Sequence, residues 1–357
     1  MTLVTTFRAS LFSRTRWLAT LLLGAAVAIQ TGCTRSGVSD PTGPIEILNV
    51  SYDPTREFYD EYNAWVAPRL QQEFGRPVAI RMSHGGSGRQ ARAVIDGLKA
   101  DVVTLAVPSD IQALVDNGSL AATDWATQFP DGAAPYTSTI VFLVRQGNPE
   151  GIRDWSDLIR DGVEVISPNP KTSGGARWIY LAAWGYALRQ QGGSNQTALQ
   201  FVSDMYRHVP VLDSGARGAS TTFARNNIGD VLLTWENEAY LLKEEMPDAN
   251  FEIVMPSVSI LARPPIALVG PNADAHGTRE ISQRYLASLY EPEAQEMAAR
   301  HHYRPSNPEI LARYASQFAP ITLFTAEEVA GDWQQAQTIH FADGAHFDQI
   351  YLAAGTQ

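Results

Sequence analysis

Three short loops rich in glycine and serine are the clearest candidates for chemistry in this chain. They are residues 84–88 (HGGSG), 172–176 (TSGGA) and 213–218 (DSGARG). A stretch with helical patterning follows each loop, at residues 90–98, 177–188 and 220–226. The first turn of a helix leaves backbone N–H groups without partners and carries about half a positive charge, so it attracts anions. Glycine lets a ligand approach the bare backbone. Three such loops that converge would therefore form a cage for a small oxyanion.

Two further segments offer hydrogen-bond donors. Residues 49–56 (NVSYDPTR) form a strand-to-helix corner, in which Pro54 suits an early helical position. Residues 229–238 (GDVLLTWENE) place the indole N–H of Trp235 just after an apolar strand. Taken alone, Trp235 indicates a core aromatic, Ser173 indicates a helix N-cap, and each loop is typical of an ordinary turn. The set as a whole favours an anion site.

At these segments the chain resembles the periplasmic sulfate-binding proteins of ABC importers. The similarity runs from about residue 45 to residue 351 and includes 136–145 (YTSTIVFLVR) and 341–351 (FADGAHFDQIY). It implies an α/β fold of the two-lobed periplasmic binding protein type (type II), with a ligand cleft between lobes joined by a hinge. It also implies binding of sulfate, delivery to the permease subunits of an ABC transporter, a monomer, and neither a cofactor nor a metal.

The resemblance implies a specific set of ligand donors. Arg177 and Arg217 would support the site from beside it, as neighbours of the backbone and not as ion-pair partners of the anion. The anion itself would be held by backbone N–H groups, one hydroxyl and one indole N–H, at Asp53, Ser87, Ser173, Gly174, Gly175, Ala216 and Trp235.

The length of the chain indicates more than one core. A chain of 357 residues with 45% hydrophobic residues is expected to form two domains. Strand-like runs alternate with amphipathic stretches such as 58–74 and 178–190, an α/β rhythm with crossovers long enough for parallel pairing. The expected strands are residues 45–50, 78–82, 101–107, 140–144, 164–166, 231–235, 253–255 and 265–269.

The expected lobes are discontinuous in sequence. Residues 45–138 and 262–320 are assigned to lobe 1 and residues 139–261 to lobe 2. Residues 321–357 are expected to pack back on the lobes. The chain would cross between lobes near 136–144 and return near 259–269, so that a ligand between the lobes clamps the hinge shut.

Residues 1–33 have the pattern of an export signal. Arg8, Arg14 and Arg16 precede an apolar run, residues 17–29, that is too short to span a bilayer. Residues 34–44 read as a tether, because they are rich in glycine, serine, proline and threonine. Either reading of the signal exports the chain and predicts a periplasmic location.

Two cleavage sites are possible in the signal, and they predict different outcomes for Cys33, the single cysteine. The run 31–33 (TGC) resembles a bacterial lipoprotein box, in which Cys33 would be lipidated and anchor the protein to the membrane. Cleavage after residues 26–28 (AVA) would instead release a soluble protein with an unmodified Cys33.

Charge and hydrogen-bonding chemistry limit the range of possible ligands. A net charge of −11 argues against nucleic acid and repels a dianion, so local dipoles in a cleft must supply the attraction. Sulfate accepts hydrogen bonds at every oxygen, whereas monohydrogen phosphate carries a proton that needs an acceptor. Burying that proton among donors costs about 1–3 kcal/mol. The carboxylate of Asp53 could act as an acceptor if it faced the ligand, but the resemblance assigns the backbone N–H of Asp53 to the site. Thiosulfate, also an acceptor-only dianion, is the alternative ligand.

Enzyme patterns fit less well. The stretch 85–89 (GGSGR) fails the G-x-S-x-G pattern because Arg89 stands where the second glycine belongs. A Ser-dependent hydrolase acting through Ser87 is kept as the alternative from another class. The sequence has neither a phosphate-binding G-x-x-x-x-G-K-[ST] loop nor an H-E-x-x-H motif. The glutamates at positions 236, 238, 244 and 245 are predicted to form a solvated helix face.

Overall fold

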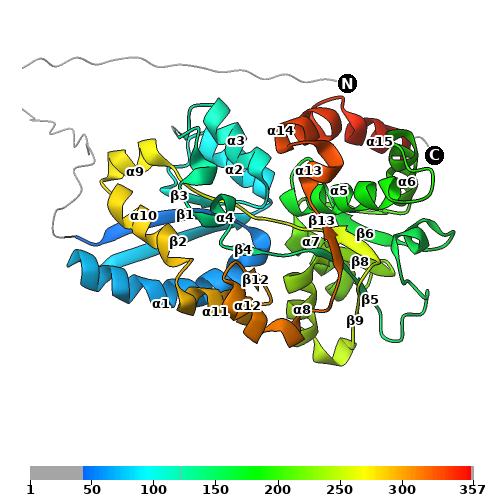
Figure 1. Ribbon diagram of the computed structural model, residues 1–357, viewed down its shortest axis with the longest axis horizontal. Coiled ribbons are helices and arrows are strands. Elements are labelled where there is room, and N and C mark those ends of the chain that lie inside the picture. Colours follow the sequence, from blue (N-terminus) through cyan, green and yellow to red (C-terminus); the bar gives the residue numbers. More distant parts are fainter. Residues whose placement is uncertain (1–42, 121, 355–357) are drawn as a thin grey trace, which may run out of the picture. The chain divides into compact units, whose positions relative to one another are not determined.

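The computed structural model describes residues 43–120 and 122–354, which belong to one compact unit, Pro41–Gln357 (Figure 1). Its strands are β1 (Ile45–Tyr52), β2 (Val78–Gly85), β3 (Val102–Thr104), β4 (Tyr136–Thr137), β5 (Ile140–Val144), β6 (Val165–Pro168), β7 (Leu212–Asp213), β8 (Val231–Trp235), β9 (Glu252–Val254), β10 (Val258–Ile260), β11 (Ile266–Leu268), β12 (Arg304–Pro305) and β13 (Thr322–Phe324). Its α-helices are α1 (Arg56–Phe74), α2 (Ser87–Ile95), α3 (Pro108–Asp116), α4 (Pro130–Ala133), α5 (Gly174–Leu188), α6 (Asn195–Arg207), α7 (Ala216–Ser220), α8 (Glu236–Glu245), α9 (Gly270–His276), α10 (Arg279–Ser288), α11 (Pro292–Arg300), α12 (Pro308–Arg313), α13 (Ala326–Ala330), α14 (Trp333–Ala336) and α15 (His346–Ala354).

The first lobe is built on a four-stranded sheet in the order β11-β3-β1-β2. Figure 1 shows α2 and α3 on one side of this sheet and α1 on the other. Its core gathers buried side chains from Ile47 to Tyr136 and from Ile266 to Tyr303. The apolar faces of the sheet and of its helices are thereby removed from water, which is the main driving force for this lobe to fold.

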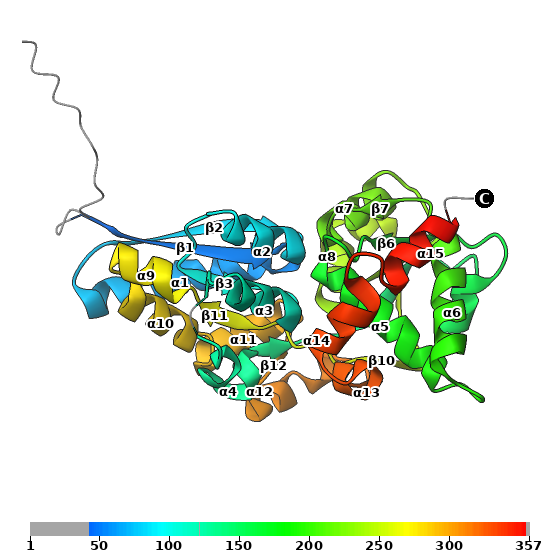
Figure 2. The ribbon, with the colours of Figure 1, turned by 90° about the horizontal axis from the view of Figure 1, so that it is seen from above.

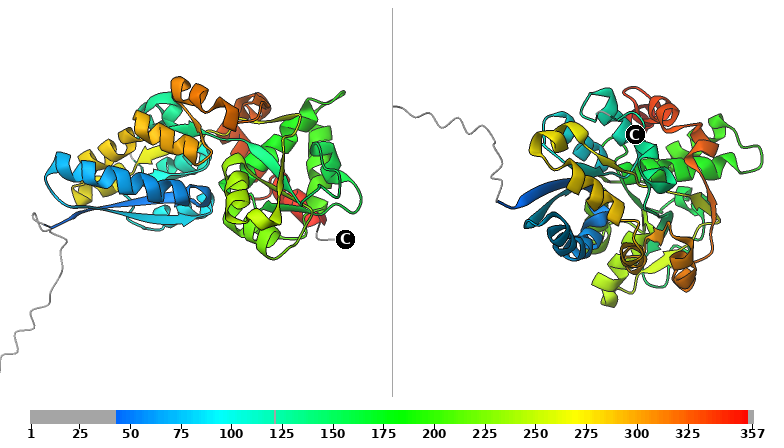
Figure 3. Two further views of the ribbon diagram at one scale, coloured as in Figure 1. Left: turned by 90° about the horizontal axis from the view of Figure 1, so that it is seen from below. Right: turned by 60° about the vertical axis from the view of Figure 1, so that its left-hand side comes forward.

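The second lobe is built on a five-stranded sheet in the order β7-β6-β8-β5-β9. Helix α5 is buried along almost its whole length and lies at the centre of the lobe (Figure 2). A helix that is apolar all round must be covered on every side. The C-terminal helices supply part of that cover: Trp333 of α14 packs edge-on against Trp178 of α5, with ring centroids 4.5 Å apart. The C-terminal segment therefore completes the core of this lobe (Figure 3).

Strand directions match the expected parallel crossovers only in part. Strands joined through a helix are parallel, as in the pairs β1–β2, β1–β3 and β6–β8. Strand β11, however, pairs antiparallel with β3, and β5 pairs antiparallel with β8 and β9. These two strands follow the segments that cross between the lobes, so no helical crossover fixes their direction.

The two crossing segments touch each other between the lobes. The backbone N–H of Ser138 donates to the carbonyl of Ala262 at 3.0 Å, and the N–H of Ala262 donates back to Ser138 at 2.9 Å. The two segments therefore form a short antiparallel connection at this point, while the predicted bounds of the lobes stay a prediction.

Most element boundaries differ from the predictions by one to three residues, and two of the differences concern segments beside the cavity. The strand expected at residues 101–107 ends at Thr104, because the next amides bond elsewhere: the N–H of Leu105 donates to Pro265 and that of Ala106 to the hydroxyl of Ser87. The helix expected at 220–226 begins earlier, at Ala216, and continues as a π-helix over Thr221–Arg225.

The predicted export signal, tether and lipidation of Cys33 lie outside the described residues, apart from the last two tether positions. Within residues 43–120 and 122–354, no helix combines the length and the apolar character that crossing a bilayer requires.

Candidate functional site

Four helical N-termini meet at one small enclosed cavity between the two sheets. Ser87 is the first residue of α2, Gly174 and Gly175 open α5, Ala216 opens α7, and Asp53 opens the 3-10 turn Asp53–Thr55. Amides at these positions have no carbonyl one turn earlier in their own helix. The partial positive charges of several helix ends are therefore directed at the same small volume.

All seven residues predicted to hold the anion line this cavity. Its lining consists of Tyr52, Asp53, Pro54, Gly85, Gly86, Ser87, Ser173, Gly174, Gly175, Ala216 and Trp235. The cavity has a volume of about 10 Å³, which is enough for a single compact group. The structure brings these residues together, while their binding of an anion stays a prediction.

The indole of Trp235 is a buried donor without a partner. Its side chain is 1% exposed, and its Nε1 has no hydrogen bond among the described residues. A Cβ atom built on Gly175 would lie 2.5 Å from this nitrogen. A buried N–H group without a partner costs about 1–3 kcal/mol, so its position in the wall of a polar cavity favours an acceptor there.

The two serines of the site have different surroundings. Ser173 is the N-cap of α5, and its hydroxyl accepts from the N–H of Ala176 at 3.3 Å. The hydroxyl hydrogen of Ser173 remains available to a ligand. The hydroxyl of Ser87 donates to Asp110 at 2.6 Å and accepts from the N–H of Ala106 at 2.9 Å. Ser87 can therefore offer its backbone N–H, with its side chain already engaged.

Glycine permits the loops to approach this closely. A Cβ atom on Gly86 would lie 2.6 Å from the carbonyl oxygen of Thr172 and 2.7 Å from that of Ser214. Residues from all three glycine-rich loops thus meet at Gly86. Any larger residue there would push the loops, and with them the helix ends, apart.

The cavity lining contains no lysine or arginine among the residues described, and Asp53 is its one carboxylate. Burial raises the pKa of Asp53, while the nearby Arg56, Arg217 and Arg89 lower it. One carboxylate oxygen lies toward Gly215, where a Cβ atom would come within 2.6 Å of it.

Arg177 lies beside the cavity and is paired across the two lobes. Its guanidinium donates to Asp110 of α3 at 2.7 Å and to the carbonyl of Pro170 at 3.0 Å. Both members of the ion pair are almost fully buried. Because Asp110 also accepts from Ser87, this pair connects α5 to the start of α2.

Arg217 forms a second pair between the lobes. It donates to both carboxylate oxygens of Glu57 in α1, at 3.0 and 2.9 Å, and lies 3.3 Å from an oxygen of Glu238. Arg177 and Arg217 are thus matched by carboxylates of this chain and do not line the cavity.

The prediction of a solvated glutamate face on α8 is wrong for two of its four members. Glu236 and Glu238 are 0% exposed, whereas Glu244 and Glu245 are exposed. Glu236 pairs with Arg304 through two hydrogen bonds, at 2.7 and 2.8 Å. Helix α8 carries these two side chains into the junction of the lobes, which its short sequence pattern does not reveal.

Glu238 is the most perturbed carboxyl group near the site. Burial raises its pKa from 4.5 to about 7, with Arg217 opposing and Glu57 and Asp53 adding to the rise. Neither of its oxygens has a hydrogen bond among the described residues. The group therefore exchanges a proton near neutral pH.

The arrangement does not support nucleophilic catalysis by Ser87. Its hydroxyl donates to a carboxylate, and no imidazole hydrogen-bonds to it among the described residues. His84, three residues earlier, has its pKa lowered to about 4 by burial and by Arg56 and Arg217, so it is neutral at physiological pH. In the described part of the chain, no cluster of three or more metal-binding side chains is present.

Several residues at the site were not singled out from the sequence. Tyr52, Pro54, Gly85 and Gly86 line the cavity, and each lies within a segment that the sequence did mark. Asp110 was missed altogether. The one local sign in the sequence is Pro108, which marks the start of α3 and so places Asp110 in the first turn of that helix.

Comparisons with known proteins agree with this architecture. The sequence model of the family described as "Bacterial extracellular solute-binding protein" matches residues 61–304. The sulfate-binding protein of Escherichia coli strain K12 is 53% identical over 306 residues, which cover 86% of this chain and 93% of that protein. The thiosulfate-binding protein of Pseudomonas aeruginosa is 48% identical, over 92% of this chain and 98% of that protein.

Among solved structures, the sulfate-binding protein SubI from Mycobacterium tuberculosis H37Rv superposes with a TM-score of 0.72 at 32% identity. The match covers 83% of this chain and 99% of that one. The described fold is accordingly that of a two-lobed type II binding protein. The chain belongs to the family of bacterial extracellular solute-binding proteins, among the sulfate- and thiosulfate-binding proteins.

Proposed function

We propose that this protein captures sulfate outside the cytoplasm and hands it to the permease subunits of an ABC importer. The observation that carries the proposal is the convergence of four helical N-termini and the partnerless indole N–H of Trp235 on one enclosed cavity. Such a cavity offers donors from several directions, which suits a tetrahedral dianion that only accepts hydrogen bonds. The similarity to the E. coli sulfate-binding protein supports the same ligand.

The charge balance around the cavity favours binding followed by release. The anion would meet backbone dipoles, the hydroxyl of Ser173 and the indole of Trp235, and the described residues place no cation in the lining. Arg177 and Arg217 are held by Asp110 and Glu57, so they steady the helix ends without becoming counter-ions. Local dipoles in a low-dielectric cleft then hold the charge despite a net charge of −11.

We propose that lobe closure is part of the binding step. Residues 45–138 with 262–320 would move against residues 139–261, with residues 321–357 carried by the second lobe. The cavity is enclosed, so an anion enters only when the lobes part. The pairs Arg177–Asp110 and Arg217–Glu57 join the two sides and would break on opening.

Thiosulfate is the second candidate, because the thiosulfate-binding protein of P. aeruginosa is also similar over almost its whole length. A terminal sulfur in place of one oxygen leaves a dianion without protons. Phosphate is disfavoured, since its proton would face donors on most sides of the cavity.

The same family membership supports export to the periplasm. Lipidation of Cys33 stays a prediction, and so does the monomeric state. The protein would carry out no chemical step of its own, and the ATPase of the importer would drive release.

Calorimetric titration of the purified protein with sulfate, thiosulfate and phosphate at neutral pH tests the proposal. We expect one anion to bind per chain for sulfate and no heat of binding for phosphate. If thiosulfate binds more tightly than sulfate, the order of the two candidates is reversed. The absence of binding for both sulfur anions would refute the proposed function.

A further inference from the structure

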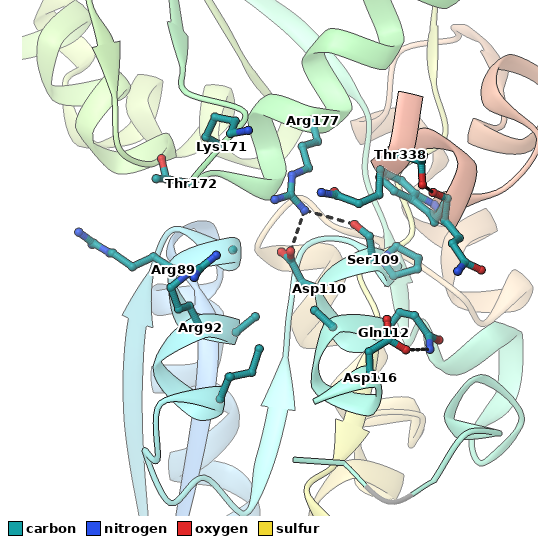
Figure 4. A pocket seen from close by; sticks show the side chains of 18 of the residues that line it. Arg89, Arg92, Ser109, Asp110, Gln112, Asp116, Lys171, Thr172, Arg177 and Thr338 are labelled. Carbon is teal, nitrogen blue, oxygen red and sulfur yellow. Dashed lines mark hydrogen bonds and ion pairs between the residues drawn. The ribbon is translucent and has the colours of Figure 1, made fainter. Parts of the chain in front are cut away.

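A groove much larger than the anion cavity lies directly beside it, with a volume of about 600 Å³ (Figure 4). Its walls come from α2, α3, the loop before α5, and the segment that starts at α14. Its lining residues Gly88 and Thr172 adjoin the cavity residues Ser87 and Ser173 in sequence, and the two hollows share no lining residue among those described. The groove therefore lies beside the helix ends that form the anion cavity.

Two of the cations in the groove are already matched. Arg177 pairs with Asp110. Lys171 pairs with Asp343 at 2.9 Å and with Asp348 at 3.1 Å. Carboxylates of the protein therefore neutralise both cations, and an approaching anion is attracted to them only weakly.

Arg89 and Arg92 differ from these two. Both are exposed, and neither has an ion pair or hydrogen bond within the residues that the structure describes. Both stand on α2, the helix whose first amide lines the anion cavity. Figure 4 shows them on one wall of the groove, with Lys171, Thr172 and Arg177 on the wall opposite.

The acidic groups of the groove are occupied locally. Asp116 accepts from the side chain of Gln112 at 2.8 Å, and Asp332 caps α14 through the N–H of Gln335 at 2.7 Å. Outside the groove lining, the charges of Arg92 and Arg89 act to lower the pKa values of Asp343 and Asp53, respectively.

A second hollow shares Pro54 with the cavity but leaves only about 30 Å³, and its lining includes Glu57 and Glu244. Arg300 of this hollow is engaged with Glu61. Arg56, which follows the turn at Asp53, is exposed and its side chain has no ion pair or hydrogen bond within the described residues, so it adds to the positive field near the cavity from outside the groove.

We propose that, once the lobes part, the groove is the route by which sulfate reaches the cavity, and that Arg89 and Arg92 steer the dianion into it. This inference rests on the proposed function. A chain with a net charge of −11 repels sulfate as a whole, so a local positive field at the mouth of the site raises the association rate. The two arginines do not touch the bound anion, and they leave its dissociation unaffected.

Stopped-flow mixing with sulfate, followed by tryptophan fluorescence, measures the two rate constants separately. The test variant is Arg89→Gln/Arg92→Gln. The matched control is Lys99→Gln/Arg153→Gln, which removes the same charge from two exposed positions outside the groove. We expect the test variant to lose roughly fivefold in the association rate constant at low ionic strength, with an unchanged dissociation rate constant.

Salt provides the second readout. Added salt screens steering, so the wild type and the control should slow with ionic strength, and the test variant should slow much less. Equal association rates for the test variant and the control would overturn the inference and leave the proposed function standing. The inference would also be overturned if the test variant changed only the dissociation rate constant and left the association rate constant as it is in the wild type. If the wild type binds no sulfate in calorimetry, the proposed function fails and this inference fails with it.

Discussion

Two side chains of the cavity, Ser173 and Trp235, add donors to its backbone amides. They differ in how much the fold itself needs them. The hydroxyl of Ser173 also caps a helix, whereas the indole N–H of Trp235 serves no other group among the described residues. Trp235 is therefore the cleanest place to test a single hydrogen bond to the anion.

Replacing Trp235 by phenylalanine should weaken sulfate binding by about 1.5–3 kcal/mol, the usual worth of a hydrogen bond to a charged group. Calorimetric titration measures the loss. Trp184→Phe is the matched control, because its indole nitrogen is also buried without a partner but does not line the cavity. Equal affinities for Trp235→Phe and the wild type would remove Trp235 from the site.

Glu238 gives a residue-scale prediction about stability. Its carboxyl group ionises near pH 4.5 when unfolded and near pH 7 in the fold, mainly because of burial. The folded state thus holds a proton that the unfolded state has lost. Its contribution to stability is complete below pH 4.5 and disappears as the pH rises through 7.

Glu238→Gln should therefore gain stability relative to the wild type as the pH rises. We expect the free energy of unfolding of Glu238→Gln, relative to that of the wild type, to rise by about 2 kcal/mol from about pH 5 to about pH 8. Urea unfolding at several pH values measures it. Asp248→Asn, at an exposed carboxylate just after α8, should show no such shift. A parallel pH dependence for Glu238→Gln and the wild type would contradict the assignment.

At the scale of elements, helix ends have two roles in this protein. Every α-helix must satisfy its first amides, and α5 and α6 both do so in part with a serine N-cap. Of these two helices, only α5 begins at the cavity. Capping and ligand binding can therefore be separated by comparing the two helices.

Ser173→Ala and Ser194→Ala should each cost about 1 kcal/mol of stability, because each removes an N-cap hydroxyl. Only Ser173→Ala should weaken sulfate binding, by roughly tenfold or more, since it also removes a donor to the anion. Thermal unfolding and calorimetric titration measure the two effects. The cap of α5 would have no part in the site if both variants bound sulfate equally well.

Whole-molecule behaviour depends on the ion pairs that join the lobes. Arg217 and Glu57 are 160 positions apart in sequence and belong to different lobes, where they form an ion pair beside the cavity. Arg177 and Asp110 form the corresponding pair near α2. Removing one partner of such a pair leaves the other charge without its counter-charge in the closed form, so the variant should favour the open form.

Glu57→Ala should raise the dissociation rate constant of sulfate about tenfold, because Arg217 loses its two-point partner across the cleft. The association rate should change little. Stopped-flow mixing measures both rates. Glu73→Ala is the matched control on the same helix, since Glu73 pairs only with Arg284 of its own lobe. A similar dissociation rate for Glu57→Ala and Glu73→Ala would rule out this pair as a closure contact.

The sequence itself determined the local features of the site. Glycine, serine and proline mark the starts of α2, α5, α7 and the turn at Asp53, because helix initiation depends on residues within one turn. The same local signals predicted the strands β5 and β8 at their observed boundaries. The seven expected ligand residues came from the resemblance to the sulfate-binding proteins, and that resemblance rests on these local motifs.

Only the tertiary structure decided how distant groups meet. The burial of Glu236 and Glu238, the pairing of Arg217 with Glu57, and the antiparallel direction of β5 all depend on segments far apart in sequence. A short acidic helix has the same pattern whether it faces water or another lobe. Burial and charge pairing are properties of the packed molecule, because they depend on which surfaces the fold brings together.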